Sequence, residues 1–216
     1  MTVRVLFLSE GTSDQGLVSH VEGIAADLGV AVTVSAPDLR WLPSRVGQSV
    51  PDKLRITREL GGTYDLAVVQ RDADRGSPDV RRTEIAEAVD KAWPELAHVP
   101  VVPVRMLEAW LLLDEQAIRE VAGNPRGRIP LDLPKATAVE RIADPKQRLK
   151  DTLAKAGDCK GRRLAELQQR FPRNRHRLLD LLDRDGPVAE VPSWQAFVSD
   201  LSGALKTAVP QGVNGP

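Results

Sequence analysis

Acidic residues follow two apolar segments of the chain at positions where they could hold a divalent cation. Glu10 comes directly after the run Val3–Ser9, and Asp72 and Asp74 lie two and four residues beyond the run Asp65–Gln70. Carboxylates gathered in one place repel one another unless a cation neutralises them, and hard oxygen ligands suit Mg²⁺ or Mn²⁺. In an extended chain Asp72 and Asp74, two residues apart, would point to the same side. The pattern predicts one Mg²⁺ or Mn²⁺ site shared by these three acids.

Two further acids are candidates for the same site, although each also has a structural explanation. Asp14 lies in the first turn of a predicted helix, where a carboxylate stabilises the helix dipole. Glu108 follows a fourth apolar run, but its neighbours Leu107 and Leu111 are typical of a core. Helix capping and solvated loop carboxylates are the alternative explanation for all of these acids.

The segments around these acids alternate between predicted strands and predicted helices. Apolar runs predict strands over Val3–Ser9, Val30–Ser35, Asp65–Gln70 and Val99–Val104. Caps and helical periodicity predict helices over 12–28, 51–60, 77–93 and 106–122. Such alternation indicates an α/β fold, with a mainly parallel sheet covered by helices on both faces. Ligands of such sheets bind beyond the carboxyl ends of the strands, which is where the acids would lie.

The pattern changes after Gly123, and only helices are expected from about Asp144 onward. They are predicted over 146–156, 162–171, 173–182 and 193–207. We therefore expect an α/β domain over 1–123 and a helical C-terminal subdomain over 124–208. The tail 209–216 is rich in Pro, Gly and Asn, which predicts disorder.

Composition excludes several classes of protein. The 216 residues are 42% hydrophobic and carry 30 basic and 30 acidic side chains, which argues against a disordered chain and against a uniformly basic coat for nucleic acid. The single cysteine, Cys159, allows neither an internal disulfide nor a cysteine-based zinc site. No apolar run has the length of a membrane span, and no signal peptide is recognisable. We expect a cytoplasmic protein that does not associate with membranes.

The neutral net charge hides an asymmetry along the chain. Residues 1–140 carry 16 basic and 21 acidic side chains, whereas residues 141–216 carry 14 basic and 9 acidic ones. The basic excess is concentrated between Lys160 and Arg177, which suggests a surface for a polyanion, although solvated helix faces would explain it equally well. The candidate phosphate contacts in this stretch are Lys160, Arg162, Arg163, Arg173 and Arg175. Three further arginines, Arg71, Arg75 and Arg105, flank the acids and could hold a phosphate or pair with the carboxylates, whereas no lysine is expected at the acidic edge.

Two motifs, Leu8–Asp14 and Val68–Asp74, resemble the Toprim domain, the fold shared by topoisomerases, primases of the DnaG type and nucleases of the OLD type. Together with a third motif, Glu108–Asp114, they are more specifically similar to the domain-of-unknown-function 4276 family of Toprim-like prokaryotic proteins. The resemblance covers most of residues 3–200, and its C-terminal part is looser.

The resemblance implies a Mg²⁺- or Mn²⁺-dependent nuclease acting on DNA or RNA. Glu10 would then be the acid/base group, Asp72 and Asp74 would bind the metal, and Asp14 and Glu108 would complete a second metal site. The resemblance also implies a partner ATPase of the ABC or AAA type, in a phage-defence or toxin-like system. The chain itself has no phosphate-binding loop motif for ATP.

Two other functions stay open at this point. One is a non-catalytic Toprim-like binding module that docks a protein partner, with its acids solvated or paired to arginines. The other is a different Asp-x-Asp enzyme, such as a phosphatase or a sugar-nucleotide transferase. The phosphatase hypothesis requires a threonine two residues after the second aspartate, and that position is Gly76.

Overall fold

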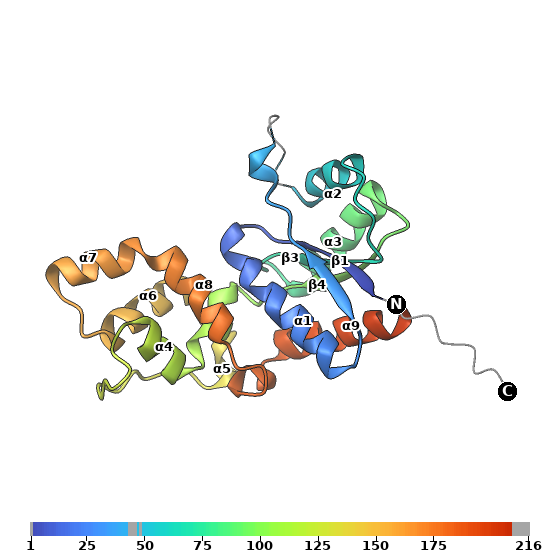
Figure 1. Ribbon diagram of the computed structural model, residues 1–216. Coiled ribbons are helices and arrows are strands. Elements are labelled where there is room, and N and C mark those ends of the chain that lie inside the picture. The colour runs from blue at the N-terminus through green and yellow to red at the C-terminus, as the bar shows by residue number, and fades with distance from the viewer. Residues whose placement is uncertain (1, 43–46, 48, 209–216) are drawn as a thin grey trace.

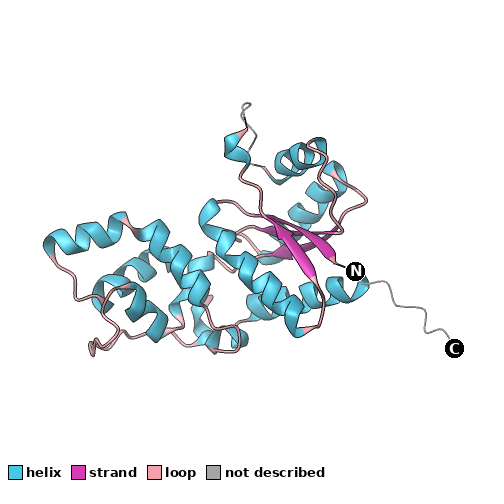
Figure 2. Ribbon diagram, in the orientation of Figure 1, coloured by secondary structure: helices cyan, strands magenta, loops and turns pink. Residues whose placement is uncertain are grey.

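The computed structural model describes residues 2–42, 47 and 49–208 and is built around one parallel sheet (Figures 1 and 2). Four strands are hydrogen-bonded in the order β2-β1-β3-β4. They are β1 (Val3–Leu8), β2 (Val32–Ser35), β3 (Leu66–Gln70) and β4 (Ala97–Val101). Each overlaps a predicted strand, so the expected α/β class with a parallel sheet is confirmed.

Helices cover both faces of the sheet because side chains alternate along each strand. Val5 and Phe7 of β1 join a core with α1 and α9, whereas Leu6 and Leu8 join a second core with α2 and α3. These helices are α1 (Leu17–Asp27), α9 (Pro192–Ala208), α2 (Val50–Glu59) and α3 (Pro78–Ala92).

The strand order reverses direction beside β1. From β1 the chain passes to β2 on one side, then returns to β3 on the other side and continues outward to β4. At such a switch point the connections after two neighbouring strands run to opposite sides and leave a crevice beyond the carboxyl ends. The crevice here lies beyond Leu8 and Gln70, next to the predicted acids.

The predicted continuous helix over 106–122 is wrong, because two shorter helices occupy that stretch. The 3₁₀ helix η3 (Leu107–Leu112) is followed by α4 (Glu115–Val121). Asp114 separates them, since its Oδ1 atom accepts a hydrogen bond from the backbone nitrogen of Ala117 at 2.9 Å and caps the second helix.

The helices from α4 to α8 form a lobe beside the sheet (Figure 1). We use the name helical lobe for α4 together with α5 (Ala136–Val139), α6 (Pro145–Ala156), α7 (Gly161–Gln169) and α8 (Phe171–Leu181). Helix α8 packs against η3 and against the 3₁₀ helix η1 (Thr12–Gly16) that follows β1. The lobe is thereby connected to the carboxyl edge of the sheet. Two other 3₁₀ helices are η2 (Leu39–Trp41) and η4 (Pro187–Glu190).

Helix α9, predicted as part of a C-terminal subdomain, returns to the sheet and packs against β4 and α1. Trp194 on α9 is 2% exposed and makes edge-to-face contacts with Trp110, Phe197 and His20. Helix α9 thus follows the predicted boundary near 123–144 in sequence but packs with the sheet in space. The boundary itself stays a prediction. The predicted disordered tail, 209–216, lies outside the described residues. Among the described residues no helix has both the length and the apolar character needed to cross a bilayer.

Candidate functional site

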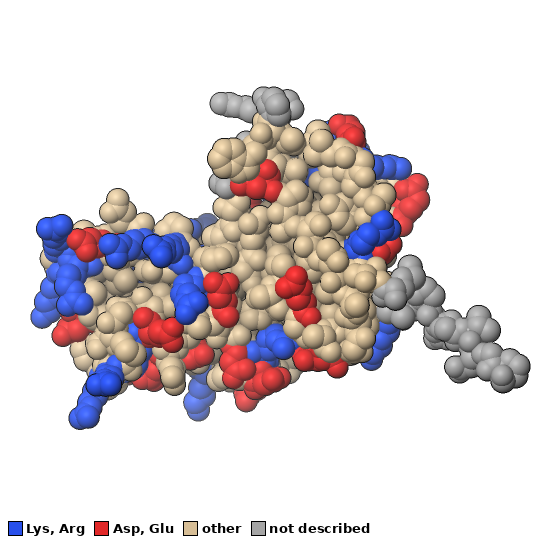
Figure 3. Space-filling model, in the orientation of Figure 1, with Lys and Arg blue, Asp and Glu red and all other residues tan. Residues whose placement is uncertain are grey.

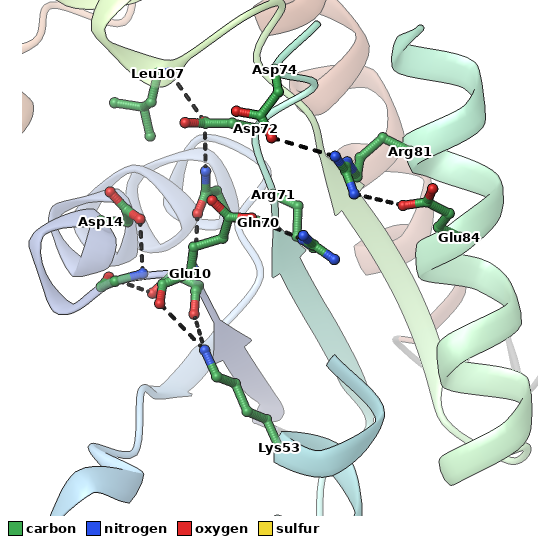
Figure 4. Close-up of polar contacts among 12 residues, drawn as sticks. Glu10, Asp14, Lys53, Gln70, Arg71, Asp72, Asp74, Arg81, Glu84 and Leu107 are labelled. Carbon is green, nitrogen blue, oxygen red and sulfur yellow. Dashed lines mark hydrogen bonds and ion pairs between the residues drawn. The ribbon is translucent and has the colours of Figure 1, made fainter. Parts of the chain in front are cut away.

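Glu10 and Asp72 lie at the switch point, one beyond each of two neighbouring strands (Figure 4). The side chain of Gln70, 1% exposed, links them. Its Oε1 atom accepts a hydrogen bond from the backbone nitrogen of Glu10 at 3.4 Å, and its Nε2 atom donates to Oδ1 of Asp72 at 3.0 Å. The predicted convergence of the two acids at one edge is therefore present, and a buried amide positions both.

Acids from three strand ends line one pocket at this point. The pocket has a volume of about 210 Å³. Its carboxylates are Glu10 and Asp14 after β1, Asp72 after β3 and Glu108 after β4. The remaining lining residues come from the connection after β4, from η1 and from the helical lobe: Ser13, Met106, Lys146, Phe171, Pro172 and Arg175. Four carboxylates face two cationic side chains, so the pocket attracts positive charge.

Arg175 on α8 pairs with two of these acids from within the fold. Its side chain is 8% exposed, and its Nε atom lies 3.0 Å from Oε1 of Glu108. Its Nη1 atom is hydrogen-bonded to Oδ1 of Asp14 and lies 2.9 Å from Oγ of Ser13. The expectation that Arg175 belongs to an exposed basic surface is wrong, because the packing of α8 against η1 and η3 buries it between two carboxylates.

Asp72 is held in surroundings that disfavour its charged form. Burial raises its pKa to about 8, and the nearby carboxylates of Glu108, Asp14 and Glu10 add to the effect, whereas Arg175 opposes it. Its Oδ1 atom accepts hydrogen bonds from Gln70 and from the backbone nitrogen of Leu107, the latter at 3.1 Å. Within the described part of the chain Oδ2 has no hydrogen-bond donor, which leaves one carboxylate oxygen for a ligand.

Asp74 lies outside the pocket that Asp72 lines. It has a φ of 53°, so the chain turns after Asp72 instead of staying extended, and Asp74 is an exposed residue outside the lining of the pocket. Its Oδ2 atom pairs with Nη2 of Arg81 at 3.5 Å, and its backbone nitrogen donates to the carbonyl of Arg105 at 2.8 Å. Arg105 also has a positive φ, 64°, and two such non-glycine conformations cost about 1–3 kcal/mol each. The expectation that the two aspartates point the same way is wrong for this reason.

Two cationic side chains contact the segment around Glu10, and only one of them was predicted to lie there. Arg71, a predicted phosphate contact, donates from Nε to Oε1 of Glu10 at 2.9 Å. Lys53 on α2 donates from Nζ to the carbonyl oxygens of Ser9 at 2.8 Å and of Glu10 at 3.4 Å. The expectation that no lysine enters this edge is wrong, since Lys53 and the pocket residue Lys146 both reach it. No local pattern in the sequence places a residue of α2 or α6 there.

Arg105, another predicted basic contact, is half-buried, and the remaining five are exposed. Arg75 lies in the turn after Asp74, and Lys160, Arg162, Arg163 and Arg173 lie at or near α7 and the start of α8. Figure 3 shows basic side chains gathered over the end of the helical lobe farthest from the sheet. Among them Arg162 pairs with Glu166 at 3.0 Å on the same helix.

The donor set suits a hard divalent cation only in part. In the described residues no three His, Cys, Asp or Glu side chains are arranged as a ready-made metal site. Mg²⁺ is commonly held through only one or two carboxylates together with water and substrate phosphates. Glu10 Oε2 and Asp72 Oδ2 provide two such oxygens, because the hydrogen bonds within the described chain go to the other oxygen of each carboxylate. Asp14 and Glu108 are engaged by Arg175.

Comparison with known proteins adds no relative: no protein-family model, no curated protein and no solved structure matches this chain.

Proposed function

We propose that the chain is a Mg²⁺- or Mn²⁺-dependent nuclease that hydrolyses phosphodiester bonds of DNA or RNA at the switch-point pocket. The observation that carries the proposal is the pocket of four acidic side chains from three strand ends, against which Arg175, Lys146 and the Glu10 partner Arg71 supply three positive charges. An excess of carboxylates with a raised pKa at Asp72 is the arrangement expected where a cation belongs.

In this proposal Asp72 would hold the divalent cation through its remaining carboxylate oxygen, with water and substrate phosphates as the other ligands. The cation would neutralise charge that develops on a phosphate during cleavage. Glu10 is suited to proton transfer, because its side chain is 39% exposed and Arg71 holds only one of its oxygens. Asp14 and Glu108, fixed by Arg175, would set the negative potential behind the cation.

The exposed basic side chains of the helical lobe support nucleic acid as the substrate class. Arg163 and Arg173 lie among them, on α7 and α8. Phosphate contacts of this kind give binding that depends strongly on salt and little on base sequence. The Toprim-like identity, the link to a partner ATPase and the role in phage defence rest on the motif resemblance alone.

The alternative is a non-catalytic binding module, and one observation favours it. Arg175 already pairs with both Asp14 and Glu108, and Arg71 pairs with Glu10, so three of the four acids have an internal cationic partner. If Asp72 binds no cation, the pocket is a structural ion-pair network, and the exposed lobe would dock a partner.

Thermal unfolding with and without Mn²⁺ or Mg²⁺ distinguishes the two functions without any partner. A ligand of the native state at 100 times its Kd adds about 2.7 kcal/mol, which corresponds to a rise in Tm of roughly 5–10 °C for a chain of this size. We expect this rise for the wild type and its loss in Asp72→Asn. Asp90→Asn, an exposed aspartate on α3, is the matched control and should respond like the wild type. Equal response of all three proteins, or none, would favour the binding module.

A further inference from the structure

A second pocket adjoins the acidic one and has a different character. It lies between α2 and the carboxyl ends of β1 and β3 and has a volume of about 300 Å³. Its lining residues are Leu8, Ser9, Glu10, Val50, Lys53, Val69, Gln70 and Arg71. Glu10 lines both pockets, so the two cavities meet at this residue.

The second pocket has an apolar floor. Leu8, Val50 and Val69 are 4%, 7% and 0% exposed, and all three belong to the core beneath α2 and α3. Apolar surface facing a cavity of this size, with a few polar groups beside it, is characteristic of a small-ligand site. Because the floor is apolar, it suits a flat or aliphatic group of a ligand better than a charged group.

Two cationic side chains line the same cavity, and each has N–H groups that could still donate a hydrogen bond to a ligand. Lys53 uses Nζ on two backbone carbonyls, which leaves one of its three N–H groups. Arg71 uses Nε on Glu10, and its terminal Nη groups have no acceptor among the residues that the structure describes. Both cations line one cavity, so a bound anion could contact the two of them at once.

We propose that this pocket binds one nucleotide of the substrate strand, next to the phosphodiester in the acidic pocket. Lys53 and Arg71 would contact its phosphate, and the floor of Leu8, Val50 and Val69 would pack against its base. The inference rests on the proposed nuclease function, since it names the part of the substrate that lies on the far side of Glu10.

Titration calorimetry in EDTA, with thymidine 5′-monophosphate, thymidine and inorganic phosphate as separate ligands, tests the proposal without metal or turnover. We expect the monophosphate to bind more tightly than either fragment. Lys53→Met should weaken the monophosphate by tenfold or more, because it removes the charge and keeps the aliphatic stem. Lys91→Met, an exposed lysine on α3, should stay within twofold of the wild type.

Val50→Phe tests the floor separately, since a larger side chain in the cavity should exclude the base and leave the phosphate contacts. It should weaken the monophosphate by tenfold or more and leave the affinity for inorganic phosphate within twofold. If Val50→Phe fails to fold by circular dichroism, the comparison of Lys53→Met with Lys91→Met still decides the question.

Three outcomes would overturn the proposal: no binding of the monophosphate, binding that is unchanged in Lys53→Met, or binding of phosphate as tight as that of the monophosphate. Failure here is distinguishable from failure of the nuclease proposal. Asp72→Asn should abolish stabilisation by Mn²⁺ yet bind the monophosphate in EDTA within twofold of the wild type. A protein that binds Mn²⁺ through Asp72 but no monophosphate would retain the metal site and lose only this subsite.

Discussion

The Nε atom of Arg175 lies 3.0 Å from Oε1 of Glu108, and this ion pair joins the helical lobe to the carboxyl edge of the sheet. The same guanidinium pairs with Asp14, and the side chains of all three residues are less than a tenth exposed. A residue late in the chain thus completes a cluster built by residues that follow β1 and β4.

Removal of Arg175 should destabilise the protein strongly. Arg175→Met leaves Asp14 and Glu108 buried without their shared counter-charge, a change that costs about 3–5 kcal/mol. Urea unfolding at pH 7 measures the loss. Arg163→Met, an exposed arginine on α7, should change the unfolding free energy by less than about 0.5 kcal/mol. Equal stability of the two variants would contradict the burial of this ion pair.

Asp72 should make the metal-free protein less stable as the pH rises. Its pKa is raised from 3.8 to about 8, so between these values the native state holds a proton that the unfolded state has released. The unfolding free energy of the wild type therefore decreases with pH across this window, by at most about 1.4 kcal/mol per pH unit from this group.

The variant Asp72→Asn isolates that contribution. Its Oδ1 atom can still accept from Gln70 and Leu107, and it has no charge to bury. In urea titrations with EDTA, the unfolding free energy of the variant should rise relative to that of the wild type between pH 5 and pH 8, by at most about 4 kcal/mol. Asp90→Asn should show no such pH-dependent gain, and a flat difference for Asp72→Asn would contradict the raised pKa.

Glu10→Gln should impair catalysis without unfolding the protein. The loss of a proton-transfer group typically lowers a rate by roughly 10²-fold or more. Cleavage of end-labelled DNA and RNA in Mn²⁺ measures the effect, and an unchanged Tm in EDTA shows that the fold is retained. Glu84→Gln, half exposed and paired with Arg81 on α3, should retain wild-type activity. A fully active Glu10→Gln would exclude this residue from the reaction.

Nucleic-acid affinity should depend on the outer surface of the helical lobe. Arg163→Gln and Arg173→Gln should each lower affinity for any sequence and reduce the slope of log K against log salt by about one. Fluorescence anisotropy at several salt concentrations measures that slope, with Lys91→Gln as the control. An unchanged slope in both arginine variants would place the nucleic acid elsewhere.

Trp194 should contribute to one cooperative unit that includes the sheet. Its ring lies 5.0 Å from that of Trp110, whose Nε1 atom donates to Oγ of Ser193 at 2.9 Å. Trp194→Ala should cost about 3–5 kcal/mol and leave a single unfolding transition by both circular dichroism and tryptophan fluorescence. Two separated transitions would show instead that the C-terminal helices unfold as an independent domain.

Local patterns in the sequence determined the strands, most helices and the approach of Glu10 to Asp72. Apolar runs of five or six residues with caps between them specify β1 and β3, and parallel strands must bring their carboxyl ends to one edge. Acids placed soon after such runs therefore lie at the same edge of the sheet, and those of neighbouring strands can meet. The break at Asp114 was missed because helical periodicity continues across it, while a side-chain cap interrupts the helix.

Only the tertiary structure decided which charges line the two pockets. Arg175 and Lys146 reach the acidic pocket from α8 and α6, and Lys53 reaches the second pocket from α2. Their positions follow from helix packing, which sequence spacing does not encode. Asp74 left the site because its backbone adopts a positive φ that is stabilised by a hydrogen bond to Arg105, far along the chain. Periodicity and strand ends are short-range properties of the chain, whereas the balance of charge in a pocket depends on long-range packing.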